Sequence, residues 1–202
     1  MHSNCEDNYQ VYFLQKAIEE EYGEKKDIKI EIDHYNAINY INGKKTKIIF
    51  PKYLRNYISS MNNCEKTLEY NFIGTITPKR EWINKYKNDD KNKIIHYDNT
   101  NCTKNKNYSD LDKKYYETLC KSKFTLTPTG NCPWSYRLFE AIMAMSIPII
   151  EDNDDDIFVK DYYFYYNSDE HIYNYYKAKY NYDKFCKSEH FFENIKCGIE
   201  IL

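Results

Sequence analysis

Two short segments of the chain concentrate the residue types that recognise phosphate groups. The first, residues 74–80, begins with a glycine and ends with Arg80. The second, residues 128–140, carries another glycine and ends in a stretch that contains Arg137 and Glu140. Together they hold two of the five Gly and two of the three Arg in the chain. In a sequence so poor in these residue types, this concentration indicates a site with a chemical role.

The order of these residues predicts a site for a nucleotide diphosphate. A glycine lets the backbone approach an oxyanion closely, and a helix N-terminus favours negative charge through its N–H groups and its dipole. An arginine in the first helical turn adds a permanently charged donor that can bind two oxygens at once. Because Arg137 and Glu140 are spaced to share one helix face, we expect the arginine to bind the diphosphate and the glutamate to accept hydrogen bonds from ribose hydroxyls.

The same residues also allow a purely structural interpretation. Arg137 and Glu140 could form a surface ion pair worth roughly 0.3–0.5 kcal/mol, and Gly130 could serve only a turn. In both interpretations we expect the charged pair to lie outside the core, because Leu138 and Ile142 belong to the apolar stripe of the same helix. Replacing Glu140 is therefore expected to leave fold stability almost unchanged.

Strands and helices are predicted to alternate around these two segments. The prediction places strands at 68–74, 93–97, 123–128 and 147–152, and helices at 78–86, at 109–122 with Ser109 as its cap, and at 135–145. This alternation indicates right-handed βαβ units and therefore an α/β fold with a Rossmann-like parallel sheet flanked by helices. Both glycine-containing segments follow strands, so both are expected at the carboxyl ends of the sheet, where such folds bind ligands.

The rest of the chain carries no clear functional motif. The predicted elements are a helix at 9–22, a strand at 28–32, a hairpin turn at Asn42-Gly43, a helix from Pro51 to about Met61, a short strand near 162–166 and helices in the tail.

Composition and charge exclude several classes of function. The formal net charge of −2 provides no basic excess for nucleic acid or an anionic membrane surface. The opening MHSNCEDNYQ has neither the basic nor the apolar region of a signal peptide, and no stretch approaches the roughly 20 apolar residues of a membrane span. Seven Cys without a CxxC pair fit free thiols in a reducing compartment. We therefore expect a cytoplasmic protein.

A longer stretch that includes the second segment resembles a known family signature. SKFTLTPTGNCPWSYRLFEAIMAMSIPIIED (122–152) is similar to the signature of the exostosin family of glycosyltransferases. Upstream, YNFIGTITPKR (70–80) resembles the family's strand and turn with F-x-G and a following arginine. The resemblance extends over roughly residues 68–170. The positions in register with the central signature are Ser122, Phe124, Leu126, Pro128, Gly130, Ser135, Arg137, Glu140, Ala141, Ile142, Ile147, Pro148, Ile150 and Asp152.

The resemblance implies a GT-B fold, in which two Rossmann-like lobes enclose the active site and the C-terminal lobe binds a nucleotide-sugar donor. It further implies inverting transfer without a bound metal or a cofactor. On this basis the domains are a reduced N-terminal portion of mixed helix and strand (1–67), a Rossmann-like donor-binding domain (68–170) and a C-terminal helical tail (171–202). The predicted donor-binding residues are Gly74, Thr75, Arg80, Thr129, Gly130, Asn131, Ser135, Arg137 and Glu140.

No catalytic base is assigned from the sequence. An inverting transferase needs one to deprotonate the acceptor hydroxyl, but the early cluster Glu31, Asp33 and His34 is more simply an exposed turn. The acidic run Asp152–Asp156 invites a metal site with oxygen ligands. We interpret it as a solvated loop, because it follows a strand of the predicted donor lobe.

The expected activity is transfer of a sugar from a nucleotide-diphosphate donor to a hydroxyl of a glycan or protein acceptor. Residues 1–67 are too few for a full acceptor lobe, so a partner chain could supply one. Two other functions remain open: a non-catalytic module that binds a nucleotide sugar or regulates a partner, and a structural or interaction protein that keeps the fold but not the site.

Overall fold

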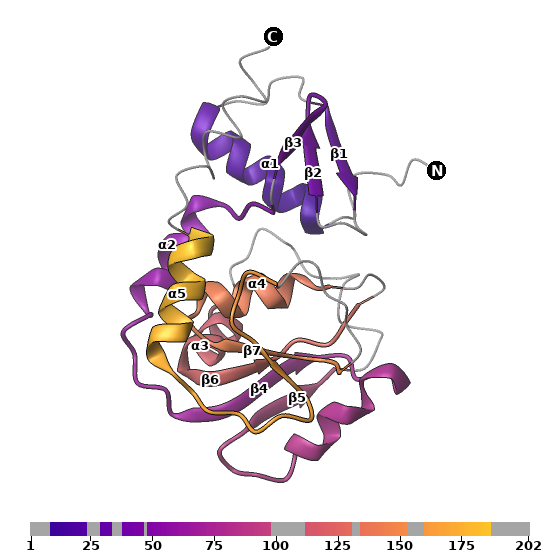
Figure 1. The fold of residues 1–202 in the computed structure, drawn as a ribbon. Helices are drawn as coiled ribbons and strands as arrows, with labels where there is room; N and C mark the ends of the chain where they lie inside the picture. Colours follow the sequence, from indigo (N-terminus) through magenta and orange to yellow (C-terminus); the bar gives the residue numbers. More distant parts are fainter. Residues whose placement is uncertain are drawn as a thin grey trace. The chain divides into compact units, whose positions relative to one another are not determined.

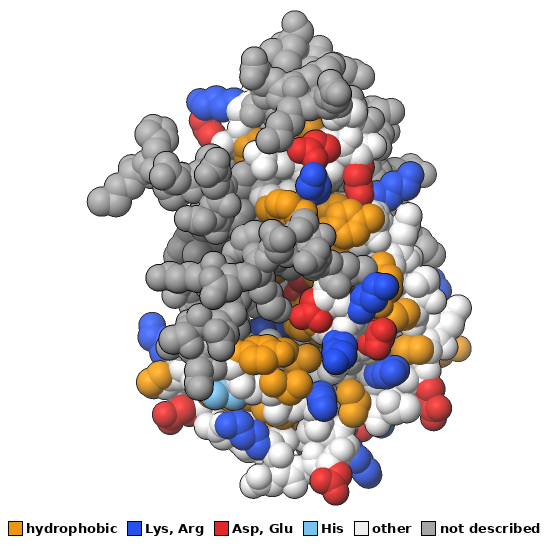
Figure 2. Space-filling view, turned by 180° about the vertical axis from the view of Figure 1, so that it is seen from behind, with side chains coloured by type: hydrophobic (Ala, Val, Ile, Leu, Met, Phe, Trp, Pro, Cys, Tyr) orange, Lys and Arg blue, Asp and Glu red, His pale blue; other side chains and the backbone are white. Residues whose placement is uncertain are grey.

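The computed structural model describes residues 9–23, 29–33, 38–46, 48–97, 112–130, 134–152 and 160–186. The chain forms two compact units, one of Met1–Tyr57 with Cys186–Leu202 and one of Ile58–Phe185. Residues 171–185 thus belong to the larger unit, whereas the sequence predicted that a separate tail begins at 171. None of the helices in the described part is both long and apolar enough to cross a membrane. On the face drawn in Figure 2, basic and acidic side chains are interspersed.

The first unit combines one helix with a small antiparallel sheet (Figure 1). Its elements are α1 (Tyr9–Tyr22), β1 (Ile30–Asp33), β2 (Ile38–Ile41) and β3 (Lys44–Thr46), with the strand order β1-β2-β3. Gly23 ends α1 in the left-handed region, at φ 78°. Asn42 and Gly43 join β2 to β3 with φ values of 49° and 78°, as the predicted hairpin turn requires. Helix α2 (Lys52–Ser60) begins in this unit, where the Glu20 carboxylate accepts hydrogen bonds from its first two backbone N–H groups.

The second unit is a five-stranded parallel sheet with helices on both faces. Strands β4, β5, β6 and β7 lie side by side in Figure 1. The elements are β4 (Leu68–Gly74), the 3₁₀ helix η2 (Pro78–Tyr86), β5 (Lys93–His96), α3 (Lys113–Lys121), β6 (Ser122–Leu126), α4 (Tyr136–Met143), β7 (Ile147–Ile150), β8 (Tyr165–Tyr166) and α5 (Tyr175–Cys186). The predicted α/β fold with a Rossmann-like sheet is confirmed.

The strand order β5-β4-β6-β7-β8 defines where this sheet can bind a ligand. The chain passes from β4 outward to β5 on one side, then returns across β4 and builds β6, β7 and β8 on the other side. The direction of winding therefore reverses between β4 and β6. In doubly wound sheets of this order, ligands bind beyond the carboxyl ends of the two strands at the reversal.

Side chains of β4 and β6 alternate between the two faces of the sheet. Phe72 and Phe124 point into a core that includes Ile83 of η2 and Ala178 of α5. Asn71, which directly precedes Phe72, is fully buried and donates to the Thr125 hydroxyl (2.7 Å) and to the Phe124 carbonyl (3.1 Å). Helices α3 and α4 pack against β4, β6 and β7. Helix α5, predicted as part of a tail, is therefore part of the sheet unit's core.

Two predicted helices differ in detail. The segment Pro78–Tyr86 is a 3₁₀ helix with a non-helical residue at Arg80 (φ −110°, ψ 15°). Its backbone N–H bonds the Thr77 carbonyl at 2.8 Å, and its side chain is held from outside the helix, as described below. Helix α3 is capped by Asp112, whose carboxylate accepts from the Tyr115 N–H at 3.1 Å. The predicted cap Ser109 lies outside the described residues.

Lys66 stabilises the C-terminal end of α4. Its ammonium donates to the Ala144 carbonyl at 2.8 Å, a position where a cation also interacts favourably with the helix dipole. Burial lowers the pKa of Lys66 to about 8, and the nearby Cys120 and Cys64 oppose that shift. At neutral pH Lys66 is therefore still mostly charged in the folded state, although burial disfavours that charge.

This pKa shift predicts a pH dependence of stability. The unfolded chain keeps the Lys66 proton up to its ordinary pKa of 10.5, whereas the folded chain loses it near pH 8. Between these values the unfolded state binds more protons, so the contribution of Lys66 to the free energy of unfolding should rise with pH. Urea unfolding of the parent and of Lys66→Met across this window should show the difference moving in favour of the parent. Lys123→Met, which removes a surface ion pair with Glu69, serves as the control. A parent-minus-variant difference that does not rise with pH for Lys66→Met would contradict the assignment.

Candidate functional site

Arg80 ties together the two loops at the reversal of the sheet. Its Nε and Nη2 donate to the Thr129 carbonyl at 3.0 and 2.8 Å, and its Nη1 donates to the Thr75 carbonyl at 3.0 Å. Thr75 follows β4, and Thr129 follows β6. One half-buried guanidinium group therefore fixes the spacing of the loops that flank the expected ligand position.

Arg137, in the first turn of α4, reaches the end of β4. Its Nη2 donates to the Ile73 carbonyl at 2.7 Å, and its guanidinium carbon lies 4.4 Å from the centre of the Phe72 ring. A Cβ atom at Gly74 would be only 2.7 Å from the same Nη2. Position 74 therefore has to be glycine for Arg137 to occupy this place. The Nε of Arg137 is buried and has no hydrogen-bond partner among the described residues.

The N-terminus of α4 has the features of an anion site. Ser135 is the N-cap residue in an extended conformation, and its side chain makes no capping hydrogen bond. Its hydroxyl oxygen is buried and has no partner within the described part of the chain. The first N–H groups of the helix and the helix dipole both favour a negatively charged ligand there. Ser135 and Arg137 thus supply polar groups at the same helix end.

Two further residues fix this end of the sheet and were not predicted. Glu151, directly after β7, accepts from the Thr129 N–H at 3.0 Å and from the Trp82 indole N–H at 3.1 Å. His96, the last residue of β5, accepts through Nδ1 from the Ile76 N–H at 3.0 Å. Both lie at carboxyl ends of strands, which is the signal that could have identified them.

Glu140 is placed differently from the sequence prediction. It was expected outside the core, but it is only 3% exposed. Its Oε2 accepts from the Tyr115 hydroxyl at 2.6 Å and its Oε1 from the Tyr116 hydroxyl at 2.9 Å. The expectation of a surface position, and with it that of an unchanged stability, is wrong, because nearly every residue of the short helix α4 is buried. The ribose contact stays a prediction that would require a rearrangement here.

The three-residue group of Tyr115, Glu140 and Arg137 is electrostatically coupled. Burial raises the pKa of Tyr115 well above its ordinary value, the charge of Glu140 raises it further, and the charge of Arg137 opposes the rise. Burial and Glu140 likewise raise the pKa of Tyr136. These tyrosines therefore keep their protons at neutral pH, and Tyr115 acts as a donor to the glutamate.

The structure brings together most of the predicted donor-binding residues. Contacts of the two arginines join Gly74, Thr75 and Thr129 at the carboxyl ends of β4 and β6. Gly130 is half-buried beside Thr129, and Asn131 lies outside the described residues.

Of the acidic run, Asp152 accepts from the Ser168 hydroxyl at 2.9 Å, while residues 153–156 lie outside the described residues. Among the described residues no group of three or more metal-ligating side chains is assembled. In the early acidic cluster, Glu31 forms an ion pair with Lys29 at 2.5 Å.

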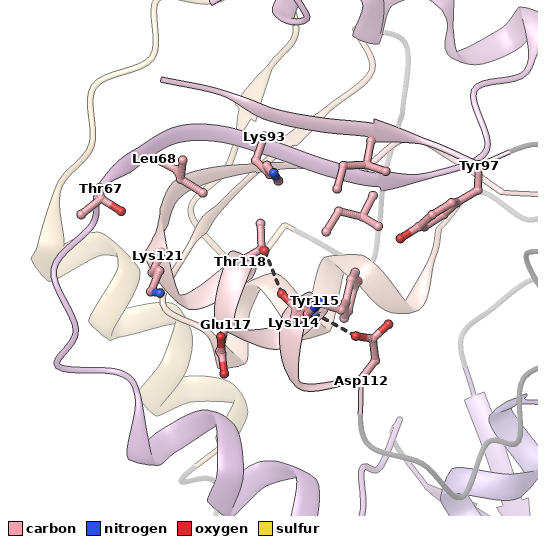
Figure 3. Close-up of a pocket in the computed structure, with 12 residues that line it drawn as sticks. Thr67, Leu68, Lys93, Tyr97, Asp112, Lys114, Tyr115, Glu117, Thr118 and Lys121 are labelled. Carbon is pink, nitrogen blue, oxygen red and sulfur yellow. Dashed lines mark hydrogen bonds between the residues drawn. The ribbon is translucent and has the colours of Figure 1, made fainter. Parts of the chain in front are cut away.

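An open groove of about 810 Å³ lies between the sheet and α3 (Figure 3). Leu68, Ile73 and Ile95 of the sheet form one wall, and α3 with Tyr115 forms the other. None of the eight predicted donor-binding residues that the structure describes lines the groove. Two of its lining residues contact predicted donor-binding residues: the Ile73 carbonyl accepts from Arg137, and the Tyr115 hydroxyl donates to Glu140.

Comparison with family models identifies the family of this chain. The family model described as the RXYLT1 C-terminal domain matches residues 49–161, which is more than half of the chain. The chain belongs to the exostosin-like glycosyltransferase family. No curated protein matches this exostosin-like chain. The matched segment contains β4 to β7 and all nine predicted site residues. The family match therefore covers the part of the chain that carries Arg80 and Arg137.

The position of Glu140 generates a stability prediction. Glu140→Ala removes the shared acceptor of two tyrosine hydroxyls, and an unpaired buried hydroxyl costs about 1–3 kcal/mol. We therefore expect a clear drop in the melting temperature and in the free energy of unfolding. Glu81→Ala, at an exposed glutamate of η2, is the control and should change stability by less than about 0.5 kcal/mol. A Glu140→Ala variant as stable as the Glu81→Ala control would show that the tyrosine contacts do not form.

Proposed function

We propose that the sheet unit binds a nucleotide-sugar donor, with the donor diphosphate beyond the carboxyl ends of β4 and β6. The observation that carries the proposal is the placement of Arg137 and the N-terminus of α4 at the point where the sheet reverses. Membership of the exostosin-like glycosyltransferase family supports the same assignment. In this proposal Arg137 and the α4 amides bind the diphosphate, and the Gly74 and Gly130 loops lie against it.

The proposed reaction is inverting transfer of the sugar to a hydroxyl group of a glycan or protein. The acceptor oxygen attacks the anomeric carbon while the bond to the diphosphate breaks, so negative charge accumulates on the leaving group. Arg137 lies where it would stabilise that charge, and preorganised donors of this kind contribute strongly to catalysis. No cofactor and no metal is needed in this scheme. The residue that removes the acceptor proton is not assigned.

Arg80 supports the site in a different way. Its three hydrogen bonds to the Thr75 and Thr129 carbonyls hold the two loops at a fixed separation. A direct contact of Arg80 with the diphosphate, as the sequence predicted, would add to this role. The proposal therefore assigns the main electrostatic contribution to Arg137, whose guanidinium makes fewer contacts within the described residues.

Two other functions make different predictions for the same experiments. A non-catalytic module would bind the donor but neither transfer nor hydrolyse the sugar, and a purely structural protein would not bind it. A partner chain that completes the acceptor side would be needed for transfer if the chain is inactive alone. Donor binding is therefore measured first, and turnover with and without acceptors second.

Binding of the donor should stabilise the fold. A ligand that binds only the folded state raises stability by about 2.7 kcal/mol at a hundredfold excess over its dissociation constant. A thermal-shift screen of nucleotide sugars should therefore identify one donor that raises the melting temperature. Arg137→Lys should weaken binding of that donor, and of pyrophosphate, by about 1.5–3 kcal/mol, because lysine cannot bind two oxygens in a fixed geometry.

The matched control for this change is Arg55→Lys, which makes the same substitution in the first unit. It should leave donor affinity unchanged as measured by calorimetric titration. Equal affinities of the parent and Arg137→Lys would reject the proposed position of the diphosphate. A parent that binds no nucleotide sugar would favour the structural alternative.

A metal-independent site predicts that chelators have no effect. Donor affinity should be the same with and without EDTA, because the arginine and the helix N-terminus neutralise the diphosphate. The measurement is the same titration, with manganese added back to the chelated sample. Loss of binding in EDTA and its recovery with manganese would instead assign a metal role to the acidic run that begins at Asp152.

A further inference from the structure

We propose that His96 donates a hydrogen bond from its Nε2 atom to the donor diphosphate, beside Arg137. This inference rests on the proposed function and adds a residue to the same site. It gives the histidine at the carboxyl end of β5 a direct contact with the ligand, in addition to its bond with the loop that follows β4.

The strand register places His96 on the same face of the sheet as the Arg137 guanidinium. His96 is the partner of Gly74 in the parallel pair of β5 and β4. Such partners share a face: two residues earlier, Phe72 belongs to the core cluster and its partner Ile94 packs against that cluster. A Cβ atom at Gly74 would lie 2.7 Å from Arg137 Nη2 on this face. Because neighbouring strands are about 4.8 Å apart, the His96 side chain begins one strand spacing from the place that the arginine occupies.

The His96 ring is held in one orientation by the peptide group between Thr75 and Ile76. The Ile76 N–H donates to His96 Nδ1 at 3.0 Å. The carbonyl of the same peptide group, that of Thr75, accepts from Arg80 Nη1 at 3.0 Å. Both polar atoms of this peptide group are therefore bonded, and the imidazole reaches from β5 to the loop after β4. This is the loop that the proposed function places against the diphosphate.

The bond from Ile76 also decides which ring nitrogen carries the proton. A nitrogen that accepts from a backbone N–H has no proton of its own, so the neutral ring of His96 carries its proton on Nε2. The side chain is exposed, and Nε2 lies across the ring from the bonded Nδ1. It is therefore a hydrogen-bond donor at the end of the sheet. Donors of this kind bind more strongly to a charged acceptor, and the oxygens of a diphosphate are charged acceptors.

The same tautomer assigns His96 to ligand binding rather than to proton removal. A general base takes up the proton on a lone pair. The lone pair of Nδ1 is engaged by the Ile76 N–H, and Nε2 already carries a proton. Arg137 would thus supply the positive charge and His96 a neutral donor, so the two side chains can bind one anion without repelling each other.

The test uses two substitutions that each keep one function of the ring. In His96→Asn the side-chain oxygen can replace Nδ1 as the acceptor for Ile76, but no donor reaches the place of Nε2. In His96→Gln the longer side chain brings an amide N–H to that place. Calorimetric titration with inorganic pyrophosphate should show about tenfold weaker binding for His96→Asn, the effect of losing one hydrogen bond to a charged group. Binding by His96→Gln should stay within about threefold of the parent.

Titrations with UDP and GDP show which part of the ligand the histidine contacts. Whichever nucleotide the parent binds should lose affinity in His96→Asn by the same factor as pyrophosphate. Unchanged pyrophosphate affinity in His96→Asn would overturn the inference. Equal losses in the two variants would also overturn it, because His96 would then act only through its bond to the loop. A loss confined to the nucleotide would move the contact to the nucleoside and would reject the diphosphate assignment.

A measurement on the parent protein does not depend on the folding of either variant. Nitrogen NMR of the histidine rings should show the neutral His96 ring with its proton on Nε2. Addition of pyrophosphate should shift the resonance of this nitrogen. A proton on Nδ1, or an Nε2 resonance that does not move with saturating pyrophosphate, would contradict the inference.

The same titrations separate this inference from the proposed function. If the parent binds none of these ligands and no nucleotide sugar, the proposed function fails. If the parent binds pyrophosphate and Arg137→Lys weakens that binding, while His96→Asn binds like the parent, the proposed function stands and only the role of His96 is rejected.

Discussion

The pairing of β4 with β6 is the constraint on which the candidate site depends. These strands are distant in the sequence, and their register sets Asn71 opposite Thr125. In this register the side-chain NH₂ group of the buried Asn71 donates to the Thr125 hydroxyl and to the Phe124 carbonyl. A slip by one residue would separate this buried NH₂ group from both acceptors and would move apolar side chains to the wrong face. The carboxyl ends of the two strands, and the loops that follow them, are therefore held side by side.

The two arginines convert this alignment into a preorganised site. Each is bound to backbone carbonyl oxygens at the ends of strands or in the following loops. Carbonyl oxygens orient a guanidinium group without removing its charge. The carboxylates nearby have other partners: Glu151 accepts from a backbone N–H and an indole, and Glu140 accepts from two tyrosines. Positive charge is thus concentrated where the sheet reverses.

The sequence predicted the order of strands and helices in the larger unit because short apolar runs alternate with helical patterns. It also predicted that Gly74, Arg80 and Arg137 would come together, since each follows a strand that ends at the same edge. It could not predict that Glu140 is buried, because the spacing of two residues on a helix does not say which face is inward when almost the whole helix is covered. The roles of Tyr115 and Tyr116 were hidden for a different reason: tyrosine is so frequent in this chain that no single one stands out.

The contact between Gly74 and Arg137 couples the evolutionary paths of the two positions. While the guanidinium lies 2.7 Å from the place of an absent Cβ atom, any side chain at position 74 is disfavoured by collision with it. Once Arg137 is replaced by a shorter residue, that collision disappears and position 74 becomes permissive at this contact. The order of substitution therefore matters, and the two positions are epistatic. After loss of the arginine, other residues can be accepted at position 74. If the glycine is replaced first, the Arg137 side chain has to move away from its present place.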